Sequence, residues 1–219
     1  MAICEQTEDP AATKGIVQRE IVRVVSPGMA FDADSLESGR NNYLFVLHPS
    51  SEHGRGAYCV SDITTGSLEY AEYTSLEQLR DDLSLIQARE IAVPSAFHQT
   101  AEWAELVKHV GQEFFACVTP SPDFYFNSPQ GAEELCRHFS VLNLEGFGLR
   151  ADHPCLGAVG ATFRTIRETQ KQGDLRHLLP PTPRPREGQE LKWVPPIDLS
   201  RYPMPPADVP LVGLLRDLL

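Results

Sequence analysis

The stretch that decides the fold is "YLFVLHPSSEHGRGAYCVSDITTGSLEYAEY", residues 43–73. Its first part, "YLFVLH" (43–48), is almost continuously apolar, as expected of a central strand that is buried on both faces. "AYCVSDI" (57–63) follows a turn that contains glycine, and "LEYAEY" (68–73) alternates strictly after the hairpin connection "TTGS". Successive strands with such short connections predict an antiparallel meander.

Beyond the meander, the apolar period lengthens from two residues to about 3.6, which is typical of helices. In chain order, we predict a helix with a capping box at Ser75 and Gln78, the strand "EIAV" (90–93), a helix capped by Thr100, the strand "FFACV" (114–118), a helix begun by Ser128 and Pro129, and a long helix over about 154–172. This order predicts an α/β fold: a five-stranded mixed sheet with helices on both faces, the ribonuclease-H-like arrangement.

The long helix carries small residues where helices usually avoid them. Gly157, Ala158, Gly160 and Ala161 lie on its adjoining faces. A glycine inside a helix costs about 1 kcal/mol relative to alanine. Two of them in one helix therefore predict that another element passes close by.

The segments on either side of the sheet cannot form a core of their own. Residues 1–28 are interpreted as a strand, a short helical turn and a second strand, the remnant of a mixed α/β domain. Residues 29–42 are a polar linker, and 43–179 form the sheet domain. Ten of the chain's 18 prolines lie between residues 180 and 210, so we expect 180–219 to be irregular.

Composition excludes some classes of function. The chain has 219 residues and a formal net charge of −11, with scattered basic residues. A module that binds nucleic acid by itself needs a basic face to displace counterions, and none is evident here. No apolar run approaches a membrane span, and the first residues lack a signal-peptide pattern. We therefore expect a cytoplasmic protein without a membrane partner.

Motifs for catalysis are absent from the sequence. It contains neither G-x-S-x-G nor a Walker motif, so we expect no catalytic residue, no cofactor site and no ATP hydrolysis by this chain. A metal-dependent nuclease that uses Asp62 and Glu90 is the alternative function. Such enzymes also need an acid on the first strand, and "YLFVLH" has none. The favoured interpretation is that Asp62 accepts local hydrogen bonds and shapes the hairpin "SDITTG".

Two pairs of histidine and cysteine could suggest zinc. Cys136 with His138, and His153 with Cys155, have a spacing shorter than structural zinc sites usually use. Cys136 also lies on the predicted core face of its helix. Packing is therefore favoured over ligation, and we expect no metal site.

Several segments together resemble one protein family. "AICEQTEDPAATKGIVQREIVRVVSPG" (2–28) resembles the end of the first domain of MutS, the bacterial DNA mismatch repair family. "DITTG", "EIAVP", "LEGFGL" and "AVGATFRTIRETQKQGDLRHL" resemble, in order, landmarks of the second or connector domain. The resemblance covers roughly residues 1–179 and preserves order and spacing.

The resemblance implies a binding and transmission module. In this family the connector has a ribonuclease-H-like fold without nuclease activity, links mismatch recognition to the ATPase, and touches duplex DNA only weakly. ATP and magnesium are bound, and the protein dimerises, through domains that do not match here. We therefore expect neither catalysis nor a cofactor in this chain.

The connector of this family also offers a surface to the partner protein MutL. The polar residues implicated lie near the end of the helix before "L-x-GFGL", which corresponds here to Arg137 and His138. Some family members have amides at these places. A solvated helix end without a partner is an equally good interpretation of the pair.

The resemblance further implies a truncated sequence. The Phe-x-Glu motif that wedges beside a mispaired base would precede residue 2, and the likeness to the lever domain stops at Val194. A truncated gene, a frameshift and a gene-calling artefact are all compatible with this. A non-functional product that aggregates through an exposed edge strand is a further possibility.

Overall fold

The computed structural model describes residues 2–6, 19–24, 26–29, 42–110, 116–170, 175–185, 192, 194–202, 210 and 212–214. Contacts divide the chain into two units, Met1–Pro183 and Arg184–Leu219. The second unit contains a 3₁₀ helix, η6 (Pro196–Arg201). The helical turn expected within residues 7–18 lies outside the described residues. No helix among those described is both long enough and apolar enough for a bilayer crossing.

Two strands open the first unit. β1 (Ala2–Gln6) and β2 (Arg19–Val24) pair antiparallel as a separate two-stranded sheet. A 3₁₀ turn, η1 (Pro27–Met29), follows them. The strand pair expected for residues 1–28 is therefore present.

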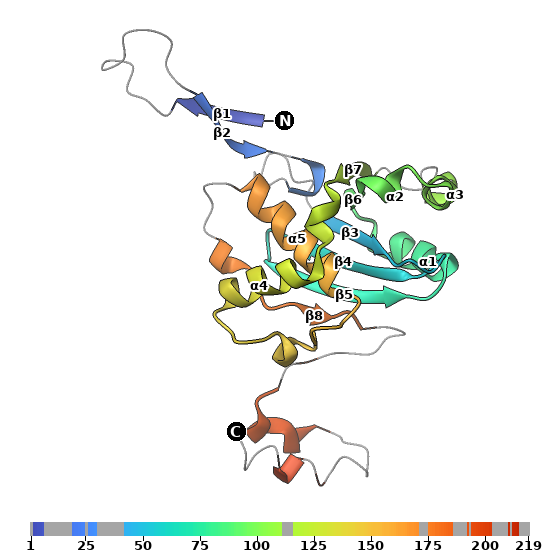
Figure 1. The fold of residues 1–219 in the computed structure, drawn as a ribbon. Coiled ribbons are helices and arrows are strands. Elements are labelled where there is room, and N and C mark those ends of the chain that lie inside the picture. Colours follow the sequence, from blue (N-terminus) through green and yellow to red (C-terminus); the bar gives the residue numbers. More distant parts are fainter. Residues whose placement is uncertain are drawn as a thin grey trace. The chain divides into compact units, whose positions relative to one another are not determined.

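The main sheet is mixed and has six strands, in the order β7-β6-β3-β4-β5-β8 (Figure 1). The strands are β3 (Tyr43–Pro49), β4 (Gly56–Asp62), β5 (Ser67–Tyr73), β6 (Glu90–Pro94), β7 (Cys117–Ser121) and β8 (Thr182–Pro183). Antiparallel pairing of β3, β4 and β5 confirms the predicted meander. β6 runs parallel to β3, and β7 runs parallel to β6.

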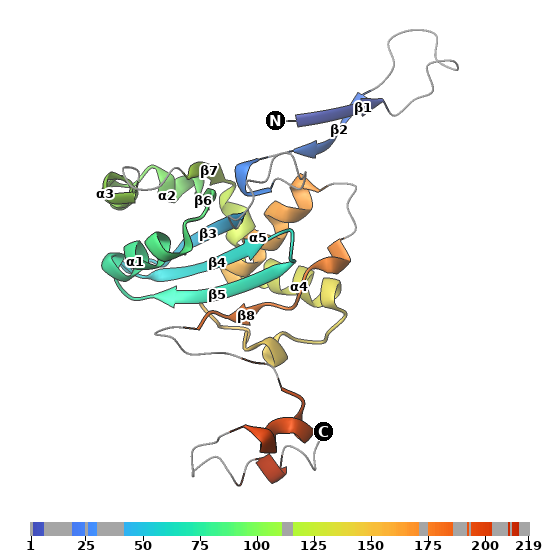
Figure 2. The same ribbon diagram turned by 180° about the vertical axis from the view of Figure 1, so that it is seen from behind.

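The prediction of five strands is wrong by one. β8 pairs in parallel with β5, with Thr182 beside Glu69 and Pro183 beside Tyr70 (Figure 2). The chain reaches this edge because the Leu179 N–H donates to the Gly66 carbonyl at 2.8 Å. A two-residue strand in a proline-rich segment has no periodic pattern, and its pairing is decided by the neighbouring strand.

Of the strand predicted at 114–118, residues 114 and 115 lie outside the described residues, and Cys117 and Val118 open β7. It continues through Pro120, which was expected to end it. β7 is the outermost strand beside β6, and a residue without an N–H is tolerated on such an edge. The edge position could not be recognised from the local sequence.

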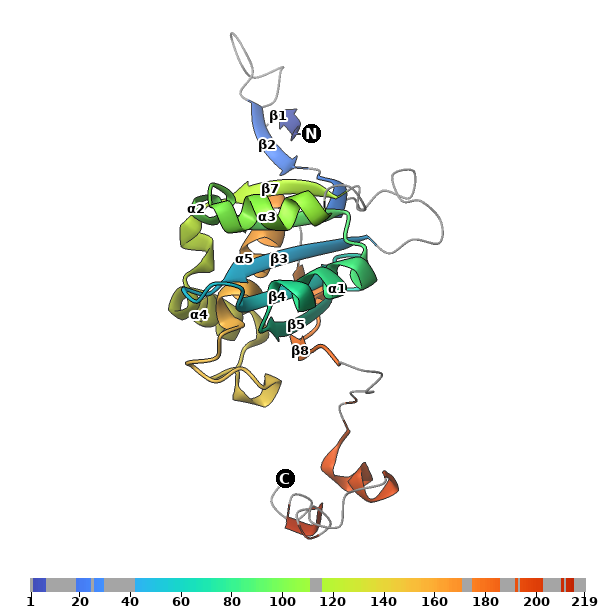
Figure 3. The same ribbon diagram turned by 90° about the vertical axis from the view of Figure 1, so that its right-hand side faces the viewer.

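Helices cover both faces of the sheet, as predicted. They are α1 (Leu76–Ile86), α2 (Ser95–His98), α3 (Ala101–Val110), α4 (Ser128–Phe139) and α5 (Leu156–Thr169). α4 and α5 lie over one face (Figure 1), and α1 and α3 over the other (Figure 3). Alternate residues of β3 serve the two layers: Leu44 and Val46 pack with α5, and Phe45 and Leu47 with α1 and α3.

Side-chain caps fix where two of the helices begin. Ser75 Oγ accepts the Gln78 N–H at 3.1 Å, and Gln78 Oε1 accepts the Thr74 N–H at 2.9 Å, close to the predicted capping box. α4 begins at Ser128 and Pro129, as predicted, and its N-cap is the preceding Asn127. Asn127 Oδ1 accepts the Gln130 N–H at 3.0 Å, and asparagine caps as well as serine does.

The glycines of α5 mark close approaches, as predicted. A Cβ added at Gly160 would lie 2.8 Å from the Cα of Gly131 on α4, and one added at Gly131 would lie 2.9 Å from the Cα of Gly160. A Cβ at Gly157 would collide with the His48 ring of β3. The missing side chains therefore let α4 cross directly on the backbone of α5.

Candidate functional site

The candidate partner-binding residues lie in the last turn of α4. This helix keeps Leu135 fully buried and ends at Ser140, which adopts the left-handed conformation (φ 56°) and returns its N–H to the Cys136 carbonyl. The sequence therefore brings Arg137 and His138 to an end of the helix whose inner face is packed on α5. The two side chains differ in their exposure to solvent.

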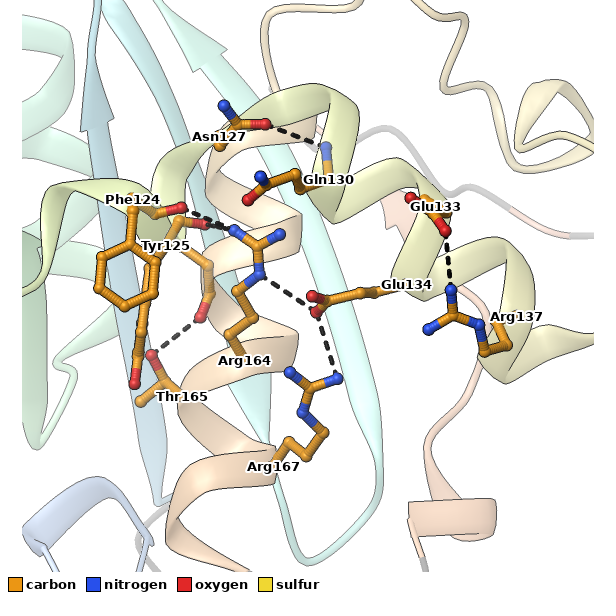
Figure 4. A network of polar contacts seen from close by, with 11 residues as sticks. Phe124, Tyr125, Asn127, Gln130, Glu133, Glu134, Arg137, Arg164, Thr165 and Arg167 are labelled. Carbon is orange, nitrogen blue, oxygen red and sulfur yellow. Dashed lines mark hydrogen bonds and ion pairs between the residues drawn. The ribbon is translucent and has the colours of Figure 1, made fainter.

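Arg137 points into solvent. Its Nη2 lies 2.7 Å from Glu133 Oε1, one helical turn earlier, and both side chains are about 70% exposed (Figure 4). Such exposed pairs contribute only about 0.3–0.5 kcal/mol. The guanidinium can therefore exchange Glu133 for a carboxylate or carbonyl of another molecule at little cost.

His138 is half-buried. Its ring lies 4.7 Å from the ring of Phe139 and 4.9 Å from that of Phe163 on α5, centroid to centroid. Successive side chains on a helix point about 100° apart. The two candidate residues therefore do not form a paired set of donors: Arg137 faces outward, and His138 packs against the neighbouring helix.

A buried ionic network lies beneath this surface, where α4, α5 and the 3₁₀ helix η3 (Asp123–Phe126) meet (Figure 4). The Arg164 side chain is only 4% exposed, and its Nε donates to Glu134 Oε2 at 3.1 Å. Its Nη1 donates to the carbonyl oxygens of Phe124 and Tyr125, both at 2.8 Å. Arg167 Nη1 reaches the same Glu134 oxygen at 3.3 Å. The network joins three elements through one arginine.

Sequence reasoning missed this network. A signal was nevertheless present, because Arg164 follows Gly160 by four residues and so lies on the face of α5 that α4 approaches. A charged residue on a face of close contact needs a buried partner. That partner, Glu134, lies 30 residues earlier in the chain, beyond the reach of a local pattern.

Asp62 shapes the hairpin, as the favoured interpretation predicted. Its Oδ1 accepts the N–H of Thr64 at 2.9 Å and the Thr64 hydroxyl at 2.6 Å. This Asx turn leads into Gly66, which has a positive φ of 77°. The Asp62 carboxylate is thus used in hydrogen bonds within the hairpin that joins β4 to β5.

Glu90 is also committed to hydrogen bonds. It is 2% exposed, and its carboxylate accepts the Thr119 hydroxyl at 2.7 Å and the Gly28 N–H at 3.1 Å. Asp62 pairs with Tyr43 and Glu90 lies beside Leu44, so both acids flank the same end of β3. Within the described residues, neither acid belongs to a group of three potential metal ligands. The nuclease alternative gains no support from this arrangement.

One group of potential metal ligands does occur among the described residues, and it includes one of the two predicted pairs, His153 with Cys155. Atoms of Glu72, His153 and Cys155 lie within 4.8 Å of one another. However, His153 Nδ1 accepts the Cys155 N–H at 3.2 Å, so the proton of the neutral ring is on Nε2, which lies 3.9 Å from Glu72 Oε1. A metal at Nε2 would require a ring with no proton on either nitrogen. The hydrogen bond from the Cys155 N–H thus holds the His153 ring in a tautomer that does not offer Nε2 to a metal.

A hollow of about 280 Å³ lies beside His153 and is lined also by His48 and Ser128. Burial lowers the pKa of His48 below its usual value near 6.5, so this ring is neutral at pH 7. Its position depends on Gly157, because any larger residue there would displace the imidazole. No convergent set of charged groups is assembled among the residues that line the hollow.

Comparison with known proteins agrees with the resemblance noted in the sequence. Residues 42–179 match the family model of MutS domain II, and residues 1–34 match that of MutS domain I. The chain is 37% identical over 172 residues to the DNA mismatch repair protein MutS of Desulfosudis oleivorans, covering 78% of this chain and 19% of that protein.

Two further relatives give the same result. The DNA mismatch repair protein MutS of Lachnoclostridium phytofermentans is 34% identical over 184 residues, which are 84% of this chain and 19% of the relative. That of Myxococcus xanthus is 33% identical over 171 residues, 78% and 19% of the two chains. The matched part is about a fifth of the length of these relatives. Since the domain II model alone matches more than half of the sequence, the chain belongs to the MutS family.

Proposed function

We propose that this chain is the connector-bearing part of a MutS-type DNA mismatch repair protein and that it acts as a binding and transmission module without catalysis. The observation that carries the proposal is the match of residues 42–179 to MutS domain II. The two candidate acids of the sheet, Asp62 and Glu90, accept hydrogen bonds. In the whole protein the module would connect mismatch recognition with the ATPase and contact duplex DNA weakly. We propose that the protein is located in the cytoplasm.

The finer fold assignment belongs to this proposal. A meander of β3, β4 and β5, with β6 and β7 added in parallel beside β3, supports a ribonuclease-H-like connector. We propose the division into a domain I remnant at 1–28, a linker at 29–42, the connector at 43–179 and a tail at 180–219. ATP and magnesium would be bound, and dimers formed, by other parts of the whole protein.

The chain alone is expected to show no ATP hydrolysis and no preference for mismatched DNA. Its net charge of −11 opposes binding to a polyanion, and its sequence offers no phosphate loop. Gel-shift titration with matched and mismatched duplexes of one length, together with a phosphate-release assay, checks this. Tight binding selective for the mismatch, or turnover of ATP, would overturn the proposal.

We also propose that the end of α4 contributes to a surface for MutL. The exposed and weakly paired Arg137 guanidinium supports this, as does Leu142, which is fully exposed just beyond the helix. Half-buried His138 would act mainly by holding the helix end against α5.

Charge reversal tests the MutL surface. Arg137→Glu is expected to weaken association with a bacterial MutL by about tenfold, because it replaces a favourable charge contact by repulsion. Arg55→Glu is the matched control, since Arg55 is also exposed and pairs locally, with Glu52 at 3.0 Å. Biolayer interferometry with immobilised MutL provides the measurement. Equal affinities of the two variants for MutL would show that Arg137 does not belong to the MutL-binding surface.

A further inference from the structure

Glu90 receives hydrogen bonds from a segment that lies outside the sheet domain in sequence. Its Oε2 accepts the Ser26 hydroxyl and the Gly28 N–H, from donors 64 and 62 residues earlier in the chain. The Gly28 bond is 3.1 Å long. The other carboxylate oxygen, Oε1, accepts the Thr119 hydroxyl from β7 at 2.7 Å. One buried side chain thus joins two strands of the sheet to the turn η1.

Because Glu90 is buried, these hydrogen bonds stabilise the position of its side chain strongly. The residue is 2% exposed, and a buried carboxylate is costly unless donors replace its water. Hydrogen bonds to a charged group are about twice as strong as neutral ones. Ser26 and Gly28 therefore supply two of the donors to this carboxylate, and the acid in return holds the segment 26–29.

The fit of the turn is also steric. Gly28 is buried, and a Cβ added there would lie 2.8 Å from Glu90 Cβ and 3.4 Å from Leu44 Cα. The backbone of the turn therefore lies directly on the first residues of β3 and β6. A residue with any side chain would force the turn away from both strands.

We infer that Glu90 is a positioning residue that anchors the segment 26–29 to the start of the neighbouring strands β3 and β6. β2 ends at Val24, two residues before Ser26, so the anchor fixes the point where the preceding strands join the sheet domain. A displacement of the first domain would then be passed to β3 and β6 instead of being absorbed by a loose linker. This last step rests on the proposed function, whereas the anchor itself does not.

The anchor is tested by measuring the rate of amide hydrogen exchange at Gly28 in the full chain with NMR. Glu90→Ala is expected to accelerate exchange at this amide by about ten- to a hundredfold, the effect of losing a hydrogen bond to a charged group. Gly28→Ala should displace the turn from the other side and accelerate the exchange of the amide at position 28 similarly, because that N–H would lose its Glu90 acceptor. Asp62→Asn is the matched control, an acid at the same end of the sheet whose hydrogen bonds are local, and should change none of these rates.

A second variant keeps the test decisive if Glu90→Ala does not fold. Ser26→Ala removes only a hydroxyl from the turn and leaves every strand of the sheet intact, and it should still accelerate exchange at Gly28. The inference is wrong if the Gly28 amide exchanges at the rate of an unstructured peptide in the unmodified chain, or if Ser26→Ala and Gly28→Ala leave the exchange rates unchanged. Since the measurement uses no DNA, MutL or ATP, its outcome is independent of the tests of the proposed function.

Discussion

Arg164→Ala is expected to lower the free energy of unfolding by about 3–5 kcal/mol, the cost of removing one partner from a buried ion pair. Among the described residues, the substitution leaves the Glu134 carboxylate, 20% exposed, with the half-exposed Arg167 as its remaining ion-pair partner. It also removes the donor to the carbonyl groups of Phe124 and Tyr125. Urea unfolding followed by circular dichroism measures the difference.

Two companion variants make this prediction specific. Arg137→Ala removes an exposed arginine paired with Glu133 on the same helix as Glu134, and should cost no more than about 0.5 kcal/mol. Arg164→Lys keeps the charge but cannot reach a carboxylate and two carbonyls at once, because an ammonium group lacks the planar fork. Similar midpoints for Arg164→Ala and Arg137→Ala would show that the buried network contributes little.

Gly160→Ala is expected to destabilise the chain by about 2–3 kcal/mol, although alanine is the better helix former. The added methyl group would lie 2.8 Å from the Cα of Gly131, so the helices α4 and α5 must move apart along their contact. Because backbone atoms stand on the other side, no side-chain rotation can relieve the collision. Thermal unfolding of the variant measures the loss.

The control for this prediction is another glycine in the same domain. Gly146 has no heavy atom within 4 Å of an added Cβ and no positive φ, so Gly146→Ala should be neutral or slightly stabilising. A Gly160→Ala chain that is as stable as Gly146→Ala would mean that the two helices can separate at no cost.

Features that depend on local pattern were predictable from the sequence. The alternation in residues 43–73 identified the meander, and Ser75 with Gln78 identified the start of α1. The glycines of α5 indicated a close neighbour, because their helical cost needs a reason. Each of these inferences uses a pattern within one strand or helix, or a short connection between neighbouring strands.

Features that depend on pairing across the chain could not be predicted. α2 is a single turn between Pro94 and Thr100, too short to show a period. The partners of Arg164 lie 30 to 40 residues away from it. Two partners of Glu90, Ser26 and Gly28, lie on a segment interpreted as part of another domain. For Glu90, the sequence suggested a possible catalytic acid, whereas its contacts make it a support for a turn. Nothing in the residue type distinguishes the two roles.

The outermost strands of the sheet share a property that bears on association between molecules. β7 contains Pro120 and β8 contains Pro183, and a proline cannot donate a main-chain hydrogen bond to an incoming strand. Each border of the sheet is thus interrupted by a residue that hinders a second molecule from extending it. The two prolines therefore disfavour polymerisation through strand pairing at both edges of the sheet.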